Sequence, residues 1–181
     1  MIKFTLDTNC IIDLEENRPD SVYLKKLLEA WHNDNINLAV VAVSASENQP
    51  AGEINNSYSQ FEKKLSSVGL SDATELLPLA IWDVFYWDHA LWSDEEMKKL
   101  SNDIRDVLFP GISLSPPEGQ KEERIWRNKL CDVLVVWCCI FHGWDTLVTR
   151  DNNFHKKKKD LFKLGVKNIL LPKEAVELCK P

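Results

Sequence analysis

Residues 36–43 (INLAVVAV) form a nearly continuous apolar run that is rich in β-branched side chains. This pattern is typical of a strand buried on both faces, as in a parallel sheet that helices cover on either side. A second β-rich segment, residues 2–6 (IKFTL), precedes it, and residues 19–35 between the two show helical spacing of apolar side chains. The sequence therefore predicts a β-α-β unit and, with it, an α/β fold.

The rest of the chain continues this alternation of helical and β-type patterns. An apolar and aromatic stretch at residues 74–87 is interpreted as containing a short strand. The other predicted elements are helices over 94–108 and 120–141, a buried strand over 145–149, a lysine-rich helix over 156–164, a strand over 169–171 and a terminal helix from Pro172 to Cys179. Together they predict a three-layer α/β/α fold around a mainly parallel sheet of four to five strands.

Length and composition indicate one globular domain. A chain of 181 residues, 44% of them hydrophobic, can bury a single core, so residues 1–181 are predicted to form one domain. Residues 53–120 fit the α/β alternation less well and are interpreted as an elaboration of it. The sequence shows neither a signal-peptide pattern nor the roughly 18 consecutive apolar residues of a membrane span, which predicts a cytoplasmic protein with no membrane partner.

Positive charge is concentrated towards the C-terminus. The net charge of −6 argues against a protein that coats nucleic acid through counterion release. Residues 150–167, however, hold seven basic and two acidic residues, a net charge of +5. A lysine-rich helix is often only a solvated surface. Any surface that faces phosphate is nevertheless predicted to include this segment, whose candidate residues are Arg150, Lys156, Lys157, Lys158 and Lys159.

Three carboxylates follow predicted strands. Asp7 ends the first strand, Glu47 follows the second by four residues, and Asp151 follows the strand over 145–149 by two. Functional groups of open α/β sheets collect at the carboxyl ends of strands, near the point where the strand order reverses. Asp132 is the fourth acid, because it lies in the apolar part of the preceding helix, where a buried carboxylate requires a partner.

Four converging carboxylates predict a bound cation. Two unit charges about 4 Å apart repel by roughly 4 kcal/mol at an effective dielectric of about 20. Several such pairs would rival a whole folding free energy of about 5–15 kcal/mol, so either some acids are protonated or a cation lies between them. Oxygen ligands favour Mg²⁺ or Mn²⁺, and such a site beside a basic segment suits phosphodiester hydrolysis.

Four blocks of the sequence resemble the PIN-domain ribonucleases. The blocks are Asp7-Thr8-Asn9 after the opening strand, Glu47 at the head of a helix, Asp132 in a late helix, and residues 149–154 (TRDNNF) after the next strand. The resemblance covers both ends of the chain and is weak between about residues 53 and 120. It implies a parallel-sheet α/β/α domain, metal-dependent cleavage of single-stranded RNA and, as in many members, a toxin role opposed by an antitoxin protein.

The resemblance also implies roles for individual residues. The catalytic acids that hold Mg²⁺ or Mn²⁺ would be Asp7, Glu47, Asp132 and Asp151. The polar residues that orient these acids or the attacking water would be Thr8, Asn9 and Thr149. Asn153 departs from the family pattern, since many members have a second acid in this last block.

Each motif also has a purely structural interpretation. Asp7 and Asp151 suit helix N-caps, and Ser44 with Glu47 forms an S-x-x-E capping box that would open a third helix. Asp13 is left out of the predicted site. The seven tryptophans are interpreted as packing in the core or in a homodimer.

Two functions of different classes follow from these patterns. The sequence contains no GxGxxG or Walker A motif, so dinucleotide and P-loop nucleotide binding lack support. The first function is a metal-dependent endoribonuclease. The alternative is a catalytically inactive PIN-like module for binding or assembly.

Overall fold

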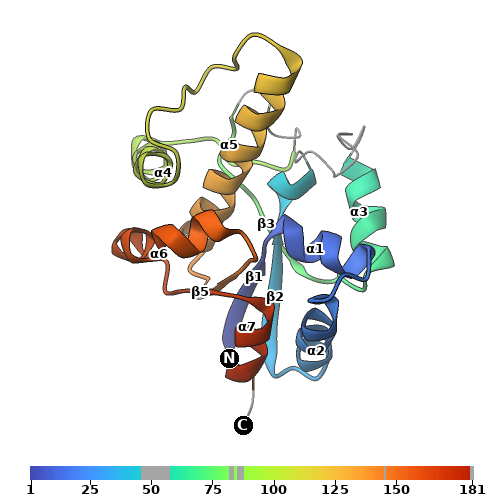
Figure 1. Cartoon of the computed structure of the whole chain (residues 1–181). Coiled ribbons are helices and arrows are strands. Elements are labelled where there is room, and N and C mark those ends of the chain that lie inside the picture. Colours follow the sequence, from blue (N-terminus) through green and yellow to red (C-terminus); the bar gives the residue numbers. More distant parts are fainter. Residues whose placement is uncertain (46–57, 82–83, 85–87, 145, 180–181) are drawn as a thin grey trace.

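The centre of the fold is a five-stranded sheet in which every neighbouring pair of strands is parallel (Figure 1). The computed structural model describes residues 1–45, 58–81, 84, 88–144 and 146–179. The strand order is β3-β2-β1-β4-β5, formed by β1 (Ile2–Leu6), β2 (Ile36–Val41), β3 (Thr74–Leu76), β4 (Thr146–Val148) and β5 (Asn168–Leu170). The predicted parallel sheet is confirmed, including a short strand within residues 74–87.

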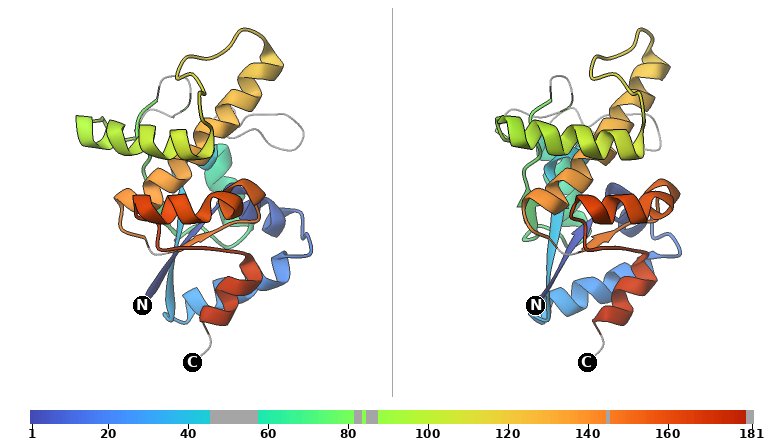
Figure 2. Two further views of the ribbon diagram at one scale, coloured as in Figure 1. Left: turned by 60° about the vertical axis from the view of Figure 1, so that its left-hand side comes forward. Right: turned by 90° about the vertical axis from the view of Figure 1, so that its left-hand side faces the viewer.

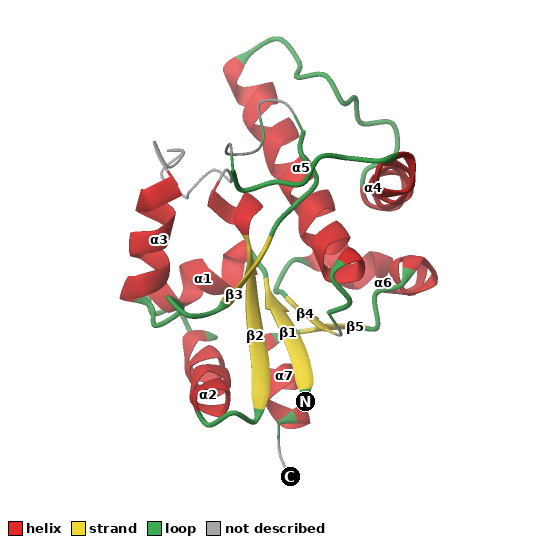
Figure 3. Ribbon diagram, turned by 180° about the vertical axis from the view of Figure 1, so that it is seen from behind, coloured by secondary structure: helices red, strands yellow, loops and turns green. Residues whose placement is uncertain are grey.

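Helices cover both faces of this sheet (Figure 2 and Figure 3). One layer consists of α1 (Thr8–Glu15), α2 (Ser21–His32), α3 (Tyr58–Ser67) and α7 (Pro172–Leu178). The opposite layer consists of α4 (Glu95–Leu108), α5 (Gln120–Phe141) and α6 (Asn152–Leu164). Each layer has its own cluster of buried apolar side chains against the sheet. The predicted three-layer α/β/α architecture is confirmed.

The two faces of the sheet are buried in strict alternation. Phe4 pairs with Leu38, and both lie in the core beneath α1 and α2. The next residues along these strands, Thr5 and Ala39, pair with each other and face the opposite layer, because successive side chains of a strand point to opposite faces. Burial on both sides explains why the second strand has no polar alternation.

Helix α5 lies at the centre of its layer. Its C-terminal half is apolar all round because it packs between α4 and the sheet, and Trp137 donates a hydrogen bond from Nε1 to the Met97 carbonyl at 3.1 Å. Within residues 130–139, all of which the structure describes, only Asp132 is not buried. Among the described residues, no helix has the combined length and apolarity to cross a membrane.

The strand order reverses between β1 and β4. The chain starts in the middle of the sheet at β1, moves outwards through β2 and β3, and returns through α4 and α5 to β4 on the other side of β1. The carboxyl ends of β1 and β4 therefore lie side by side where the two halves of the sheet diverge. This position is where ligands bind in open α/β sheets.

Ser44 lies inside η1 (Ala42–Ala45), a 3₁₀ turn that directly follows β2. The helix that the predicted capping box would open lies outside the described residues. Ala42 and Val43 belong to this turn instead of the predicted strand, because burial keeps a sequence apolar whatever its backbone conformation. Glu47 and Asp145 lie outside the described residues.

Helix α4 lies within the predicted elaboration at residues 53–120, yet it contributes to the main core. Its buried residues Met97, Ile104 and Leu108 belong to the same apolar cluster as those of α5. The helix also contacts α6. At least this part of residues 53–120 is therefore integral to the layer that covers the sheet.

Truncation of Ile104 tests this integration. Ile104 is fully buried, so we expect Ile104→Ala to lower the free energy of unfolding by about 2–5 kcal/mol through lost burial and the resulting cavity. Leu114 is 53% exposed, and Leu114→Ala is the matched control with an expected change within about 0.5 kcal/mol. Urea denaturation measures both. Equal and small effects would show that α4 is dispensable to the core.

Candidate functional site

Asp7 and Thr149 join the carboxyl ends of β1 and β4. The Asp7 backbone N–H donates to the Val148 carbonyl at 3.1 Å, and the Thr149 hydroxyl donates to Asp7 Oδ2 at 2.5 Å. Asp7 is only 3% exposed, so its carboxylate lies within the protein at the switch point of the sheet. The first carboxylate of the candidate site is thus fixed by residues from both halves of the sheet.

The Thr149 hydroxyl is the centre of a small hydrogen-bond network. Besides donating to Asp7, it accepts a hydrogen bond from Asn9 Nδ2 at 2.9 Å and another from the Asp151 backbone N–H at 2.9 Å. Asn9 Nδ2 also donates to Asp7 Oδ2, while Asn9 Oδ1 accepts from the Arg150 backbone N–H at 3.2 Å. Such a connected network restrains each of its members. The turn that carries Asp151 is thereby held against Asp7.

Asp7 and Asp151 also cap the helices that follow them. Asp7 Oδ1 accepts from the Thr8 N–H at 2.8 Å at the start of α1, and Asp151 Oδ1 accepts from the Asn153 N–H at 2.6 Å at the start of α6. The capping interpretation is therefore correct for both residues. It is compatible with a functional role, because each cap fixes a carboxylate at the same edge of the sheet.

Burial and a neighbouring charge disfavour ionisation of Asp7. The pKa of Asp7 is raised from its ordinary 3.8 to about 6. Burial is the main cause and the negative charge of Asp151 adds to it, against the lowering effect of hydrogen bonds from Thr149 and Thr8. The two carboxylates are therefore close enough to repel each other. A proton or a cation between them would relieve this repulsion.

Helix α5, which carries Asp132, forms the adjoining wall. The Thr8 hydroxyl donates to Ser44 Oγ at 2.7 Å, which ties α1 to η1, and η1 in turn packs against α5. Asp132 is the half-buried residue of an otherwise buried segment. Within the described residues, which leave out Glu47, no three His, Cys, Asp or Glu side chains are grouped as metal ligands would be. The carboxylates that the structure brings together are Asp7 and Asp151.

The predicted phosphate-binding residues have several different surroundings. Arg150 forms an ion pair with Asp13, donating from Nη2 to Oδ1 at 2.6 Å with a second contact from Nε to Oδ2. Lys158 donates to the Ile169 carbonyl at 2.8 Å. Lys156 and Lys159 are exposed and Lys157 is half-buried. Two of the five candidate side chains are thus bound to the protein itself.

Sequence reasoning missed the structural importance of Asp13. This carboxylate is fully buried, and besides Arg150 it contacts Arg18 across 3.7 Å. Arg150 lies between Thr149 and Asp151, so the Asp13 ion pair anchors the turn that presents the second acid. The sequence signal for this role is an acid at a core-facing position of an amphipathic helix, because a buried acid requires a cationic partner.

No protein-family model, curated protein or solved structure matches this chain. The chemistry of the site is therefore argued from its own residues. Asp7 and Asp151 supply hard oxygen donors, and Mg²⁺ is commonly held by one or two carboxylates with water in its other positions. The raised pKa of Asp7 beside Asp151 is the observation that fits a cation here.

Removal of the Asp13 carboxylate tests the anchoring of the turn. We expect Asp13→Asn to lower the free energy of unfolding by about 1.5–3 kcal/mol, because it removes the charged acceptor of the hydrogen bond that Arg150 donates. Asp20→Asn is the matched control, since Asp20 is 37% exposed and lies 3.8 Å from the same guanidinium, so its loss should change stability by less than about 1 kcal/mol. Urea denaturation at neutral pH measures both variants. Similar values for the two would contradict the anchoring role.

The raised pKa of Asp7 predicts pH-dependent stability of the metal-free protein. Between the ordinary pKa of 3.8 and the folded value of about 6, the folded protein binds more protons than the unfolded chain, so stability falls as the pH rises. This span corresponds to about 3 kcal/mol. We expect the stability of wild type relative to Asp7→Asn, measured by urea denaturation in EDTA, to fall by about that amount between pH values of about 4 and 7.

The Asp151→Asn background is the control for this titration. Without the Asp151 charge, the pKa of Asp7 should be lower and the fall in stability smaller. The absolute difference between wild type and Asp7→Asn includes lost hydrogen bonds, so only its change with pH is diagnostic. A difference that stays constant with pH would show that the pKa of Asp7 is not raised.

Proposed function

We propose that this chain is a Mg²⁺- or Mn²⁺-dependent endoribonuclease of the PIN type that hydrolyses phosphodiester bonds in single-stranded RNA. The observation that carries the proposal is the closeness of Asp7 and Asp151 at the switch point of a parallel sheet. The Thr149 hydroxyl donates to the Asp7 carboxylate and accepts from the Asp151 backbone N–H. A buried carboxylate held beside a second one is unfavourable for a purely structural site and suited to a cation.

The residues of the site would have distinct roles. Asp7 and Asp151 would hold the metal ion, with Asp132 and Glu47 as the further acids that the resemblance implies. The chemistry that Mg²⁺ or Mn²⁺ would supply there is activation of water for attack on phosphorus and stabilisation of the charge on the leaving oxygen. Thr149 and Asn9 fix Asp7 by donating to Oδ2, and Thr8 fixes Oδ1 through its backbone N–H.

The proposal includes expectations about where and with what the protein acts. RNA is the substrate and the cytoplasm is the proposed location. An antitoxin protein and a second copy of the chain are further partners that we infer from the resemblance alone. An adjacent small open reading frame whose co-expression relieves growth arrest would support the toxin role.

Cleavage of single-stranded RNA tests the proposal directly. With Mg²⁺ or Mn²⁺, wild-type protein should cut the RNA into fragments with 5′-phosphate and 3′-hydroxyl ends. Asp7→Asn and Asp151→Asn should each lower the cleavage rate by more than about 100-fold, since each removes a metal ligand. Gel electrophoresis with end-group analysis measures rate and chemistry together.

Asp160→Asn is the matched control for these two variants. Asp160 is an acid on α6 that pairs with Lys163 at 2.7 Å, away from the switch point, so its loss should leave the rate within about twofold. Fragments that end in 2′,3′-cyclic phosphate would exclude metal-assisted hydrolysis. Wild-type protein that binds neither metal would instead favour the inactive binding module.

A further inference from the structure

The N-terminal half of α5 extends beyond the carboxyl ends of the strands, on the side of the sheet where Asp7 and Asp151 lie (Figure 1). Figure 2 shows the same projection from two further directions. Residues 130–139 of this helix are buried except at Asp132, whereas Lys121, Arg124 and Ile125 are exposed. Helix α5 therefore has a buried segment beside the site and an exposed N-terminal half, which we call the arm.

One face of this arm leads directly to Asp132. At 3.6 residues per turn, Lys121 and Asn128 lie within about 40° of Asp132 around the helix axis, and Arg124 lies on one flank of the same face. With a rise of about 1.5 Å per residue, Lys121 is about 16 Å from Asp132 along the axis and Asn128 about 6 Å. Two cations and an amide thus precede the acid along one stripe of the helix surface.

A hollow of about 380 Å³ lies against this face. Among the described residues its lining is Lys121, Arg124, Ile125 and Asn128. The acids of this part of the helix lie elsewhere: Glu123 pairs with Arg127 at 3.3 Å on the opposite face, and Glu122 lines a different hollow. Among the described residues, the lining of this hollow thus holds two cations and no acid.

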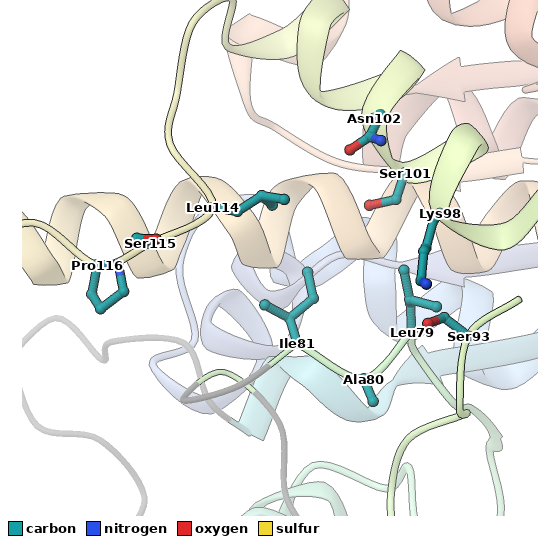
Figure 4. Close-up of a pocket in the computed structure, with 10 residues that line it drawn as sticks. All are labelled: Leu79, Ala80, Ile81, Ser93, Lys98, Ser101, Asn102, Leu114, Ser115 and Pro116. Atoms are coloured by element: carbon teal, nitrogen blue, oxygen red, sulfur yellow. The ribbon is translucent and has the colours of Figure 1, made fainter. Parts of the chain in front are cut away.

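A second pocket among the described residues has a more apolar lining. It has a volume of about 430 Å³ and lies between α4 and the segments at residues 79–81 and 114–116 (Figure 4). Its lining includes the apolar side chains Leu79, Ile81 and Leu114, and its ammonium group, Lys98, already pairs with Glu95 at 3.1 Å. Apolar walls with one ammonium group suit a phosphate chain poorly.

We propose that the stripe Lys121–Arg124–Asn128 binds the phosphate backbone of single-stranded RNA and directs it towards Asp132. This inference rests on the proposed function, because RNA is the polyanion that such a site would process. Arginine and lysine bind phosphate through charge-assisted hydrogen bonds, and asparagine binds it through its amide. The exposed Lys121 and Arg124 on α5 would add to the exposed Lys156 and Lys159 on α6.

Binding of a fluorescein-labelled oligouridylate, measured by fluorescence anisotropy in EDTA, tests the stripe without any cleavage. The double variant Lys121→Ala/Arg124→Ala should bind on the order of tenfold more weakly than wild type at moderate salt. The slope of log affinity against log salt concentration should fall by about 1.4, or about 0.7 for each lost phosphate contact. Both residues are exposed, so the variant should keep the wild-type circular dichroism and melting temperature.

Lys25→Ala/Lys26→Ala is the matched control, because it removes two exposed lysines from α2 in the opposite layer. It should change affinity less than threefold, or about 0.6 kcal/mol.

The variant Lys156→Ala/Lys159→Ala compares α6 with α5 in the same assay. Loss of affinity in the α6 variant alone would overturn the inference, and so would wild-type protein that binds no RNA at low salt. RNA that binds through the stripe but is never cleaved with Mg²⁺ would retain the inference and refute the proposed ribonuclease activity.

Discussion

The hydrogen bond from the Thr149 hydroxyl to the buried Asp7 carboxylate is the interaction on which the site depends. It spans the point where the two halves of the sheet diverge, and it brings the turn at Asp151 against the end of β1. Without it, Asp7 would retain its burial and lose the donor that most lowers its pKa. Burial disfavours the Asp7 charge even though the carboxylate caps α1. The site thus retains an unfavourable charge in a position where a ligand can compensate it.

Support for this arrangement comes from both layers of helices. From one layer, Asp13 on α1 holds the guanidinium of Arg150, and Thr8 holds η1 through Ser44. From the other, α5 packs on η1. The carboxylate pair is therefore restrained from two sides, as a site that must maintain a fixed geometry requires.

Much of the fold could be predicted because burial leaves a local pattern. The helix predicted over residues 120–141 is confirmed to the residue. Its charged first half is followed by an apolar segment and then by His142-Gly143, which marks the C-terminal end. Long-range partners leave no such pattern: the Ser44 hydroxyl pairs with Thr8, 36 residues away, and Arg150 pairs with Asp13, 137 residues away. Local rules therefore assigned Ser44 to a helix cap and Arg150 to the phosphate surface. The meeting of Asp7 and Asp151 was accessible from sequence only through the rule for strand ends in parallel sheets.

The distance along the chain between Asp7 and Thr149, 142 residues, also determines when the site can exist. The opening strand is synthesised first, but its neighbour β4 and the partner of Thr149 in β5 are synthesised last, so a nascent chain has one acid and no site. Contacts of such high sequence separation form late in folding. A polypeptide with this topology therefore brings its two carboxylates together only after its C-terminal segment has emerged from the ribosome.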